Sequence, residues 1–169
     1  MTANDAVKKH QPESVLVTGG GGFLGGAIVK RLVARGDRVR SLSRKHYTEL
    51  EAIGVEQIPG DLSDPTIVAQ ACKDSNIVFH VAAKPPPWGK YKDYYTTNVV
   101  GTENVIAGCI RHKVARLVYT STPSVVFDGT DKQGADESLP YPAKHTAYYP
   151  ETKALAEQRS FHSRQGGAQ

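Results

Sequence analysis

The side chains best suited to acid-base chemistry in this sequence are a tyrosine and a lysine four residues apart, Tyr149 and Lys153. In a helix, residues at this spacing lie next to each other on one face. A phenol exchanges protons poorly at neutral pH, and a neighbouring ammonium group stabilises its ionised form. Pro150 suits the first turn of a helix, which places Tyr149 at the helix edge, directed at a cleft. We therefore expect Tyr149 to transfer a proton, although the same spacing also occurs in unrelated surface pairs.

A cluster of hydroxyl groups, Tyr119-Thr-Ser-Thr-Pro-Ser124, follows a β-branched segment that predicts a strand over residues 117–121. Open α/β sheets bind their ligands at the carboxyl ends of the strands. A hydroxyl there can hold a substrate carbonyl while Tyr149 protonates it and a nicotinamide delivers hydride. An ordinary turn at the end of a strand is the alternative interpretation.

Four consecutive glycines separate two apolar segments near the N-terminus. Gly19, Gly22 and Gly25 have the spacing G-x-x-G-x-x-G between a predicted strand, 14–18, and a predicted helix, 23–35. In that position the glycines permit a tight turn, a close approach of a pyrophosphate to the backbone, and close packing of helix on strand. The free N–H groups at the start of the helix suit phosphate oxygens. The spacing in this context predicts a dinucleotide site.

The rest of the chain alternates short apolar runs with segments of helical period. Strands are also predicted at 39–43, 55–58 and 77–83, and helices after Asp64-Pro65 and from about 91 to 112. Apolar spacing predicts inward positions in two helices: Leu24, Ala27, Ile28 and Leu32, and Val99, Thr102, Ile106, Cys109 and Ile110. Parallel strands need helical crossovers, so we expect an α/β, doubly wound parallel sheet with helices on both faces.

The end of the second predicted strand reads Ser41-Leu-Ser43-Arg44, without the acid that often binds a ribose 2′-hydroxyl in NAD sites. A hydroxyl beside a guanidinium suits a 2′-phosphate, so we expect NADPH rather than NADH. Arg44 as a solvated loop cation is the alternative. Asp61 follows the third predicted strand, where it either binds the adenine amino group or caps a turn.

Length, composition and charge limit the number of domains, the location and the partners that we expect. A chain of 169 residues, 39% hydrophobic and 22% charged, suits one domain over 14–169 behind a polar tail, 1–13. The net charge of +4 is scattered, which argues against nucleic-acid binding, and no apolar run is long enough to span a membrane. We expect a cytoplasmic location. Cys72 and Cys109 are expected to be buried free thiols, and no metal site is expected.

Taken together these motifs resemble the extended short-chain dehydrogenase/reductase family. The resemblance covers about residues 14–160 in order: Thr18 to Gly25 is similar to T-G-x-x-G-F-L-G, Asp61-Leu62 to an aspartate-leucine pair, and His80 to Ala83 to H-x-A-A. Asn98 to Thr102 resembles N-V-x-G-T, and Tyr149 with Lys153 resembles Y-x-x-x-K. The resemblance implies a Rossmann-type fold and an oxidoreductase acting on CH-OH groups with NAD(P).

The resemblance also implies roles for particular residues. Thr122, with Ser121 as the near alternative, corresponds to the catalytic Ser/Thr, Tyr149 to the acid/base, and Lys153 to the residue that stabilises the phenolate and holds the nicotinamide ribose. The implied cofactor-binding set is Gly19, Gly22, Phe23, Leu24, Gly25, Ser43, Arg44, Asp61, Leu62, Ala82, Ala83, Lys84, Asn98, Thr120, Tyr149 and Lys153.

Within the family, residues 119–127 and 148–157 are most similar to the 3β-hydroxysteroid dehydrogenase branch. Residues 80–95 resemble a bacterial group that reduces 2-alkyl-3-oxoalkanoates, which are β-keto acids, with NADPH. The implied substrate is a small molecule with a ketone or secondary alcohol on a large apolar body, against which Trp88 and nearby tyrosines can pack. A homodimer is also implied.

Family members are longer than this chain, so we expect the C-terminal substrate lobe to be absent and the Rossmann domain to be incomplete at its C-terminus. Two alternatives follow. A truncated chain can act as a nucleotide-binding module without turnover, and a nucleotide-sugar epimerase or dehydratase uses the same core. The intact set of Thr122, Tyr149 and Lys153 favours an enzyme over a pure binding module.

Overall fold

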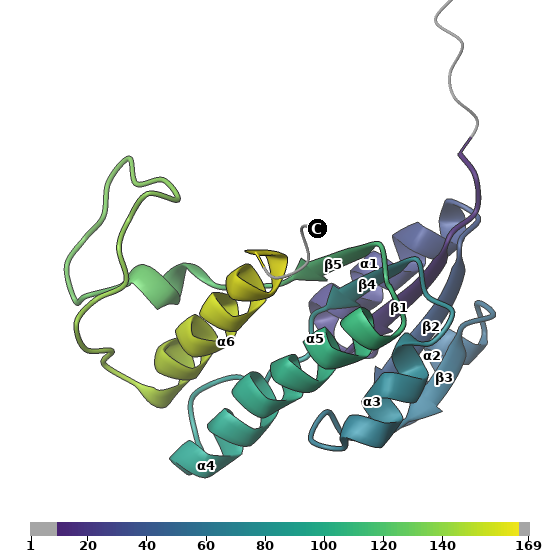
Figure 1. The fold of residues 1–169 in the computed structure, drawn as a ribbon, viewed down its shortest axis with the longest axis horizontal. Helices are drawn as coiled ribbons and strands as arrows, with labels where there is room; N and C mark the ends of the chain where they lie inside the picture. The colour runs from purple at the N-terminus through teal and green to yellow at the C-terminus, as the bar shows by residue number, and fades with distance from the viewer. Residues whose placement is uncertain (1–9, 166–169) are drawn as a thin grey trace, which may run out of the picture.

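The computed structural model describes residues 10–165, which form a parallel β-sheet covered by helices (Figure 1). Within these residues the sheet has five strands in the order β3-β2-β1-β4-β5, and every pairing is parallel. Their bounds are Ser14–Thr18 (β1), Arg38–Ser43 (β2), Glu56–Pro59 (β3), Ile77–His80 (β4) and Arg116–Tyr119 (β5). The chain runs outward from β1 to β3 and then returns to β4 beside β1, so the predicted doubly wound, Rossmann-type sheet is confirmed.

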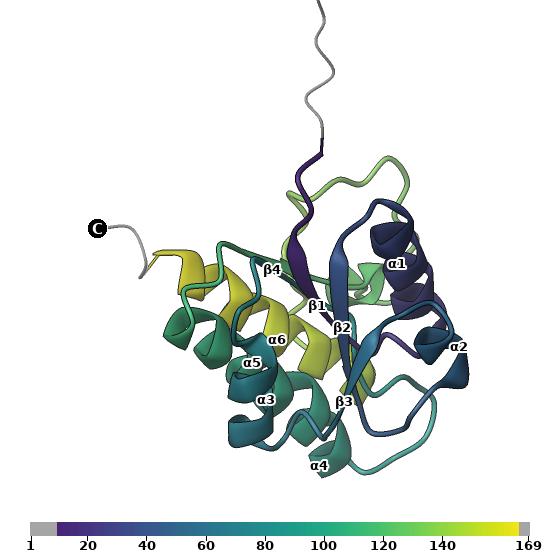
Figure 2. The same ribbon diagram turned by 90° about the vertical axis from the view of Figure 1, so that its right-hand side faces the viewer.

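Helices cover both faces of this sheet. The α-helices are α1 (Phe23–Ala34), α2 (Thr48–Glu51), α3 (Pro65–Cys72), α4 (Tyr91–Tyr94), α5 (Gly101–Arg111) and α6 (Tyr148–Gln165). A π-helical segment η1 (Tyr95–Val100) joins α4 to α5, and a 3-10 turn η2 (Pro123–Val126) follows β5. Figure 2 shows α1 and α2 on one side of the strands and α3, α5 and α6 on the other.

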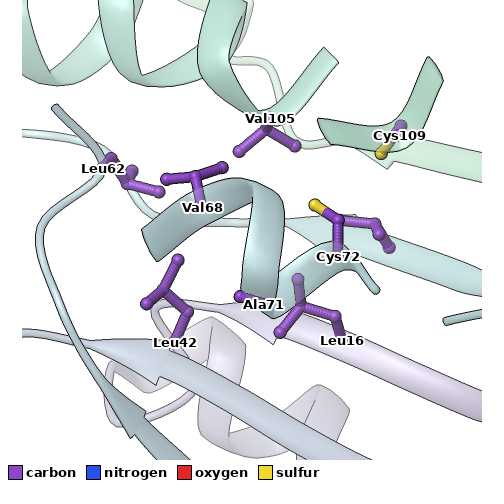
Figure 3. Packing of buried hydrophobic residues seen from close by; sticks show 9 residues of the cluster. Leu16, Leu42, Leu62, Val68, Ala71, Cys72, Val105 and Cys109 are labelled. Carbon is purple, nitrogen blue, oxygen red and sulfur yellow. The ribbon is translucent and has the colours of Figure 1, made fainter. Parts of the chain in front are cut away.

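Alternate residues of the strands supply the two halves of the core. Leu16 of β1 joins Leu42 and Val78 in a cluster under α3 and α5, part of which is drawn in Figure 3. Its neighbours Val15 and Val17 pack with residues of α1 and α2 on the opposite face. This period of two is what a sheet buried on both faces requires.

Two strands end earlier than predicted. β4 stops at His80 instead of residue 83, because the N–H groups of Val81 and Ala82 leave the sheet and donate to the Thr18 hydroxyl, each at 3.2 Å. β5 stops at Tyr119 instead of residue 121. The ends of β4 and β5 thus open into a cleft three and two residues sooner than apolar composition indicates.

Two predicted helix faces were partly wrong. In α1 the buried residues are Gly25, Val29 and Leu32, whereas Leu24 and Ala27 are exposed. In α5, Ile110 is 67% exposed, whereas the buried face includes two glycines, Gly101 and Gly108, against which side chains of Leu62 and Cys72 pack closely. Hydrophobic periodicity cannot register contacts that depend on the absence of a side chain.

Cys72 of α3 and Cys109 of α5 are confirmed as buried free cysteines. The fold places the two thiols side by side in the cluster between the helices (Figure 3). A hydrogen bond with Cys72, together with burial, raises the pKa of the Cys109 thiol.

In the part of the chain that the structure describes, no helix is both long enough and apolar enough to cross a bilayer. The same residues contain no group of three or more His, Cys, Asp or Glu side chains arranged to hold a metal ion. Most of the predicted polar tail, residues 1–9, lies outside the described residues, as do residues 166–169.

Candidate functional site

The turn between β1 and α1 forms the floor of the candidate site. Gly19 has φ of +72°, a left-handed conformation that suits glycine, and its carbonyl oxygen accepts the N–H of Gly22 at 3.0 Å. A Cβ at Gly25 would overlap that same carbonyl oxygen and lie 2.8 Å from its carbon. Close packing of helix start on strand end therefore depends on Gly25, as the motif predicts.

Helix α1 begins without a side-chain cap. Gly22 is the N-cap and makes no side-chain hydrogen bond, so the first N–H groups of the helix are available to a ligand. Only the Gly19 oxygen, at 3.3 Å, lies within 4 Å of the place that a Cβ on Gly22 would occupy. This turn therefore leaves room for a phosphate group where the positive end of the helix dipole would attract it.

A cavity of about 970 Å³ opens above this turn, along the carboxyl ends of the strands. It collects thirteen of the predicted cofactor-binding residues: Gly19, Gly22, Phe23, Leu24, Gly25, Ser43, Arg44, Asp61, Leu62, Ala82, Ala83, Thr120 and Tyr149. Its lining also includes residues outside the predicted set: Leu42, Lys45, Tyr47, Gly60, Val81, Pro85, Thr97 and Pro123. Lys45 could have been predicted from the sequence, since it is a second cation beside Arg44. The other residues have no sequence feature that indicates a place in the cavity.

At one end of the cavity lie Ser43, Arg44 and Lys45, which follow β2, and Asp61, which follows β3. One carboxylate oxygen of Asp61 accepts the N–H of Ser63 at 2.9 Å and its hydroxyl at 2.8 Å. These hydrogen bonds lower the pKa of Asp61, and the charge of Arg44 lowers it further. Asp61 therefore caps a turn and also lines the cavity. Both predicted roles, turn cap and ligand of the adenine amino group, are compatible with this position.

At the other end lie Tyr149, half-buried at the start of α6, and the hydroxyl residues after β5. The Ser121 hydroxyl donates to the Glu157 carboxylate. Thr122 instead caps η2, where its hydroxyl oxygen accepts the N–H of Ser124. The Thr122 hydroxyl also lies 3.0 Å from the Ser124 hydroxyl. Where Ser124 is the donor of that hydrogen bond, Thr122 keeps its own proton for a ligand carbonyl, which distinguishes it from Ser121.

Lys153 lies one helical turn beyond Tyr149 and is 4% exposed. Its Nζ donates to the carbonyl oxygen of Thr120 at 2.7 Å and lies 4.1 Å from the centroid of the Tyr119 ring. Burial lowers the pKa of the Lys153 ammonium to about 8. Lys153 does not line the cavity in this structure; Thr120, to which it is bonded, does.

Two further residues of the predicted set act from behind the cavity wall. Asn98 is 2% exposed, and its amide accepts the N–H of Lys84 at 2.7 Å and donates to the Thr152 hydroxyl at 3.0 Å. Thr152 in turn donates to the carbonyl oxygen of Tyr148. The Lys84 side chain is turned toward the Tyr94 ring, with Nζ 5.2 Å from its centroid. Asn98 thus ties the segment after β4 to the first turn of α6, which carries Tyr149.

His80 connects the glycine turn to this network. Thr18 accepts two backbone N–H groups, so its own proton goes to Nδ1 of His80 at 2.7 Å. Thr102 gives its proton to the Asn98 carbonyl oxygen at 2.6 Å and so accepts Nε2–H of His80, at 2.9 Å. This pattern assigns the neutral Nε2–H tautomer to His80, because both ring nitrogens are already paired in that form.

His80 should make the stability of the chain depend on pH. Burial, helped by the charge of Lys153, lowers its pKa from 6.5 to about 3. Between these values the unfolded state binds one more proton at this residue than the folded state does. His80 is therefore expected to lower the free energy of unfolding by about 1.4 kcal/mol for each pH unit between about 6 and 3. Urea unfolding at pH 7, 6 and 5 measures this slope.

The matched comparison is between His80→Gln and His112→Gln, each measured over the same pH range. The first variant should lower stability at pH 7 and flatten the slope, whereas the second should retain the slope of the parent chain. Parallel pH profiles for the parent and His80→Gln would contradict the assignment.

The chain is similar in sequence to known proteins. The family model for the 3-beta hydroxysteroid dehydrogenase/isomerase family matches residues 16–165. A 2-alkyl-3-oxoalkanoate reductase from Stenotrophomonas maltophilia is 52% identical over 148 residues, 86% of this chain and 44% of that protein. One from Shewanella oneidensis is 46% identical over 167 residues, 99% of this chain and 43% of that protein.

The solved structures agree on the fold. The UDP-glucose 4-epimerase of Thermus thermophilus, in complex with NAD, superposes with a TM-score of 0.79 at 30% identity, covering 90% of this chain and 51% of that one. The chain spans less than half the length of the two reductases it matches. Because the family model matches residues 16–165, nearly the whole described chain, the chain belongs to the 3-beta hydroxysteroid dehydrogenase/isomerase family.

Proposed function

We propose that this chain binds NADPH in the strand-end cavity and forms the cofactor half of a reductase. Its substrate would be a β-keto group on a large apolar body, as in a 2-alkyl-3-oxoalkanoate or a 3-ketosteroid. The observation that carries the proposal is that the glycine turn, Arg44, Thr122 and Tyr149 all line one cavity. The two similar reductases support the substrate class.

The nicotinamide supplies the hydride when bound. Thr122 donates a hydrogen bond to the substrate carbonyl oxygen, and Tyr149 donates a proton to the same oxygen. Lys153 stabilises the resulting phenolate through its positive charge, which the Thr120 carbonyl oxygen and the Tyr119 ring hold in place. Asn98 and Thr152 hold the first turn of α6, which fixes the position of Tyr149.

The preference for NADPH rests on the residues at the end of β2. Ser43, Arg44 and Lys45 line the cavity there, and the last residues of β2 include no carboxylate to repel a 2′-phosphate. Arg44 is exposed and can turn its guanidinium toward a phosphate, to which it can make two parallel hydrogen bonds. Titration of the chain with NADPH and with NADH, followed by fluorescence, tests the preference.

Arg44→Leu is expected to weaken NADPH binding by about tenfold or more, because a charge-assisted hydrogen bond is worth about 1.5–3 kcal/mol. NADH lacks the 2′-phosphate, so its affinity should change little. Arg31→Leu, which removes an exposed cation from α1, is the matched control. Equal losses for both dinucleotides, or none, would show that Arg44 does not recognise the 2′-phosphate.

Two alternatives can be separated by experiment. The likeness to a UDP-glucose 4-epimerase structure favours nucleotide-sugar chemistry, which NAD-dependent turnover of a UDP-hexose would reveal. The second alternative is a binding module without turnover. NADPH binding with no oxidation in the presence of a 2-alkyl-3-oxoalkanoate would support that alternative for the 169-residue chain.

A further inference from the structure

The loop at residues 44–47 connects β2 to α2 and borders the cavity with three of its side chains, Arg44, Lys45 and Tyr47. Its first part is anchored by the Ser43 hydroxyl, which donates to the carbonyl oxygen of Lys45 at 3.1 Å. Exposed cations on a short loop can point in many directions, so their usefulness to a ligand depends on how firmly the backbone beneath them is held.

Gln57 of β3 holds the far end of this loop at two points. Its side-chain Oε1 accepts the N–H of Tyr47 at 2.8 Å, and its Nε2 donates to the carbonyl oxygen of Tyr47 at 2.9 Å. The same Nε2 lies 3.1 Å from Nε2 of His46. The acceptor and both donors of one half-buried amide are thus directed at two successive residues of the loop.

The position of Gln57 in the sheet brings its side chain to this loop. Gln57 lies opposite Ser41 in the parallel register of β2 and β3, on the sheet face that α1 and α2 cover. The Tyr47 ring reaches from the loop to the glycine turn, where it occupies the space that a Cβ on Gly21 would take. Tyr47 is therefore fixed by its backbone to β3 and by its ring against Gly21.

We propose that Gln57 is a positioning residue for cofactor specificity: by fixing Tyr47 it orders the 44–47 loop and so places Arg44 and Lys45 to recognise a 2′-phosphate. This inference rests on the proposed NADPH site. Gln57 makes no contact with the cavity itself; it acts through the loop. Loss of its two hydrogen bonds to Tyr47 frees the loop, which must then be ordered each time the 2′-phosphate binds.

The test compares Gln57→Met, which keeps the length of the side chain and removes its hydrogen bonds, with Gln70→Met, the same change on an exposed position of α3. Dissociation constants for NADPH and NADH are measured for each folded variant. Gln57→Met is expected to weaken NADPH binding by about tenfold and NADH binding by less than about twofold, because only NADPH uses the loop cations. Gln70→Met should match the parent chain.

Residue-resolved amide hydrogen exchange on the parent chain tests the same contact without a variant. The Tyr47 amide should exchange more slowly than those of Lys45 and His46 in the same loop. Equal exchange rates, or an unchanged NADPH-to-NADH affinity ratio in Gln57→Met, would overturn the role of Gln57 while leaving the NADPH site intact. A parent chain without any preference for NADPH would instead overturn the proposed cofactor, and the role of Gln57 with it.

Discussion

Gly25→Ala is expected to unfold part of the glycine turn and to abolish measurable dinucleotide binding. The new Cβ would overlap the Gly19 carbonyl oxygen and lie 3.0 Å from the Cα of Gly20, and both of these are backbone atoms. Overpacking of this kind costs about 1–3 kcal/mol or more, against a gain of about 1 kcal/mol in helix propensity. A glycine-to-alanine change inside a helix normally raises stability. A net loss of stability in Gly25→Ala would therefore point to the close contact as its cause.

The matched control is Gly26→Ala, one residue further along α1. There a Cβ would meet only the Gly20 carbonyl oxygen, at 3.3 Å, so the gain in helix propensity should roughly offset the contact. Thermal unfolding and fluorescence titration with NADPH measure both variants. If Gly25→Ala were as stable as the parent chain and bound NADPH equally well, the close packing of α1 on β1 would not be required for the site.

In the proposed reductase, Tyr149→Phe is expected to reduce ketone reduction by about 100- to 10,000-fold, because it removes the proton donor, and to change NADPH affinity far less. The ring remains in the cavity wall and the first turn of α6 keeps its hydrogen bonds through Thr152. Oxidation of NADPH in the presence of a 2-alkyl-3-oxoalkanoate, followed by absorbance, measures turnover in the parent and the variant.

Tyr148→Phe provides the comparison for the neighbouring tyrosine. Its ring packs edge-on against Tyr91, with centroids 5.4 Å apart, and it is about half exposed. Turnover in Tyr148→Phe should stay within about twofold of the parent, since the removed hydroxyl is at the surface. Similar losses in both variants would indicate that the hydroxyl of Tyr149 is not the proton donor.

The order and type of the main elements could be read from local sequence because local rules set them. Asp64-Pro65 predicts a helix start, and the Asp64 side chain does accept the N–H groups of Thr66 and Ile67. The glycine spacing predicts the turn between β1 and α1, and the apolar segments predict five parallel strands whose carboxyl ends meet. Composition and spacing thus determined the fold class and the edge of the sheet where the candidate cavity lies.

Features of the site that depend on contacts between distant segments were decided only by the tertiary structure. Thr18 lies 62 residues before the end of β4, and its hydroxyl accepts the N–H groups of Val81 and Ala82, which ends β4 earlier than its apolar composition predicts. Lys153 was predicted as a partner of Tyr149, but its burial beneath Thr120 follows from how α6 packs beside β5. Gln57 carries no local signal at all, because its hydrogen bonds to Tyr47 form only when β3 lies beside the 44–47 loop. Local sequence sets the periodicity and the turns, whereas the surroundings of a side chain, and hence its pKa and partners, arise only when the layers pack together.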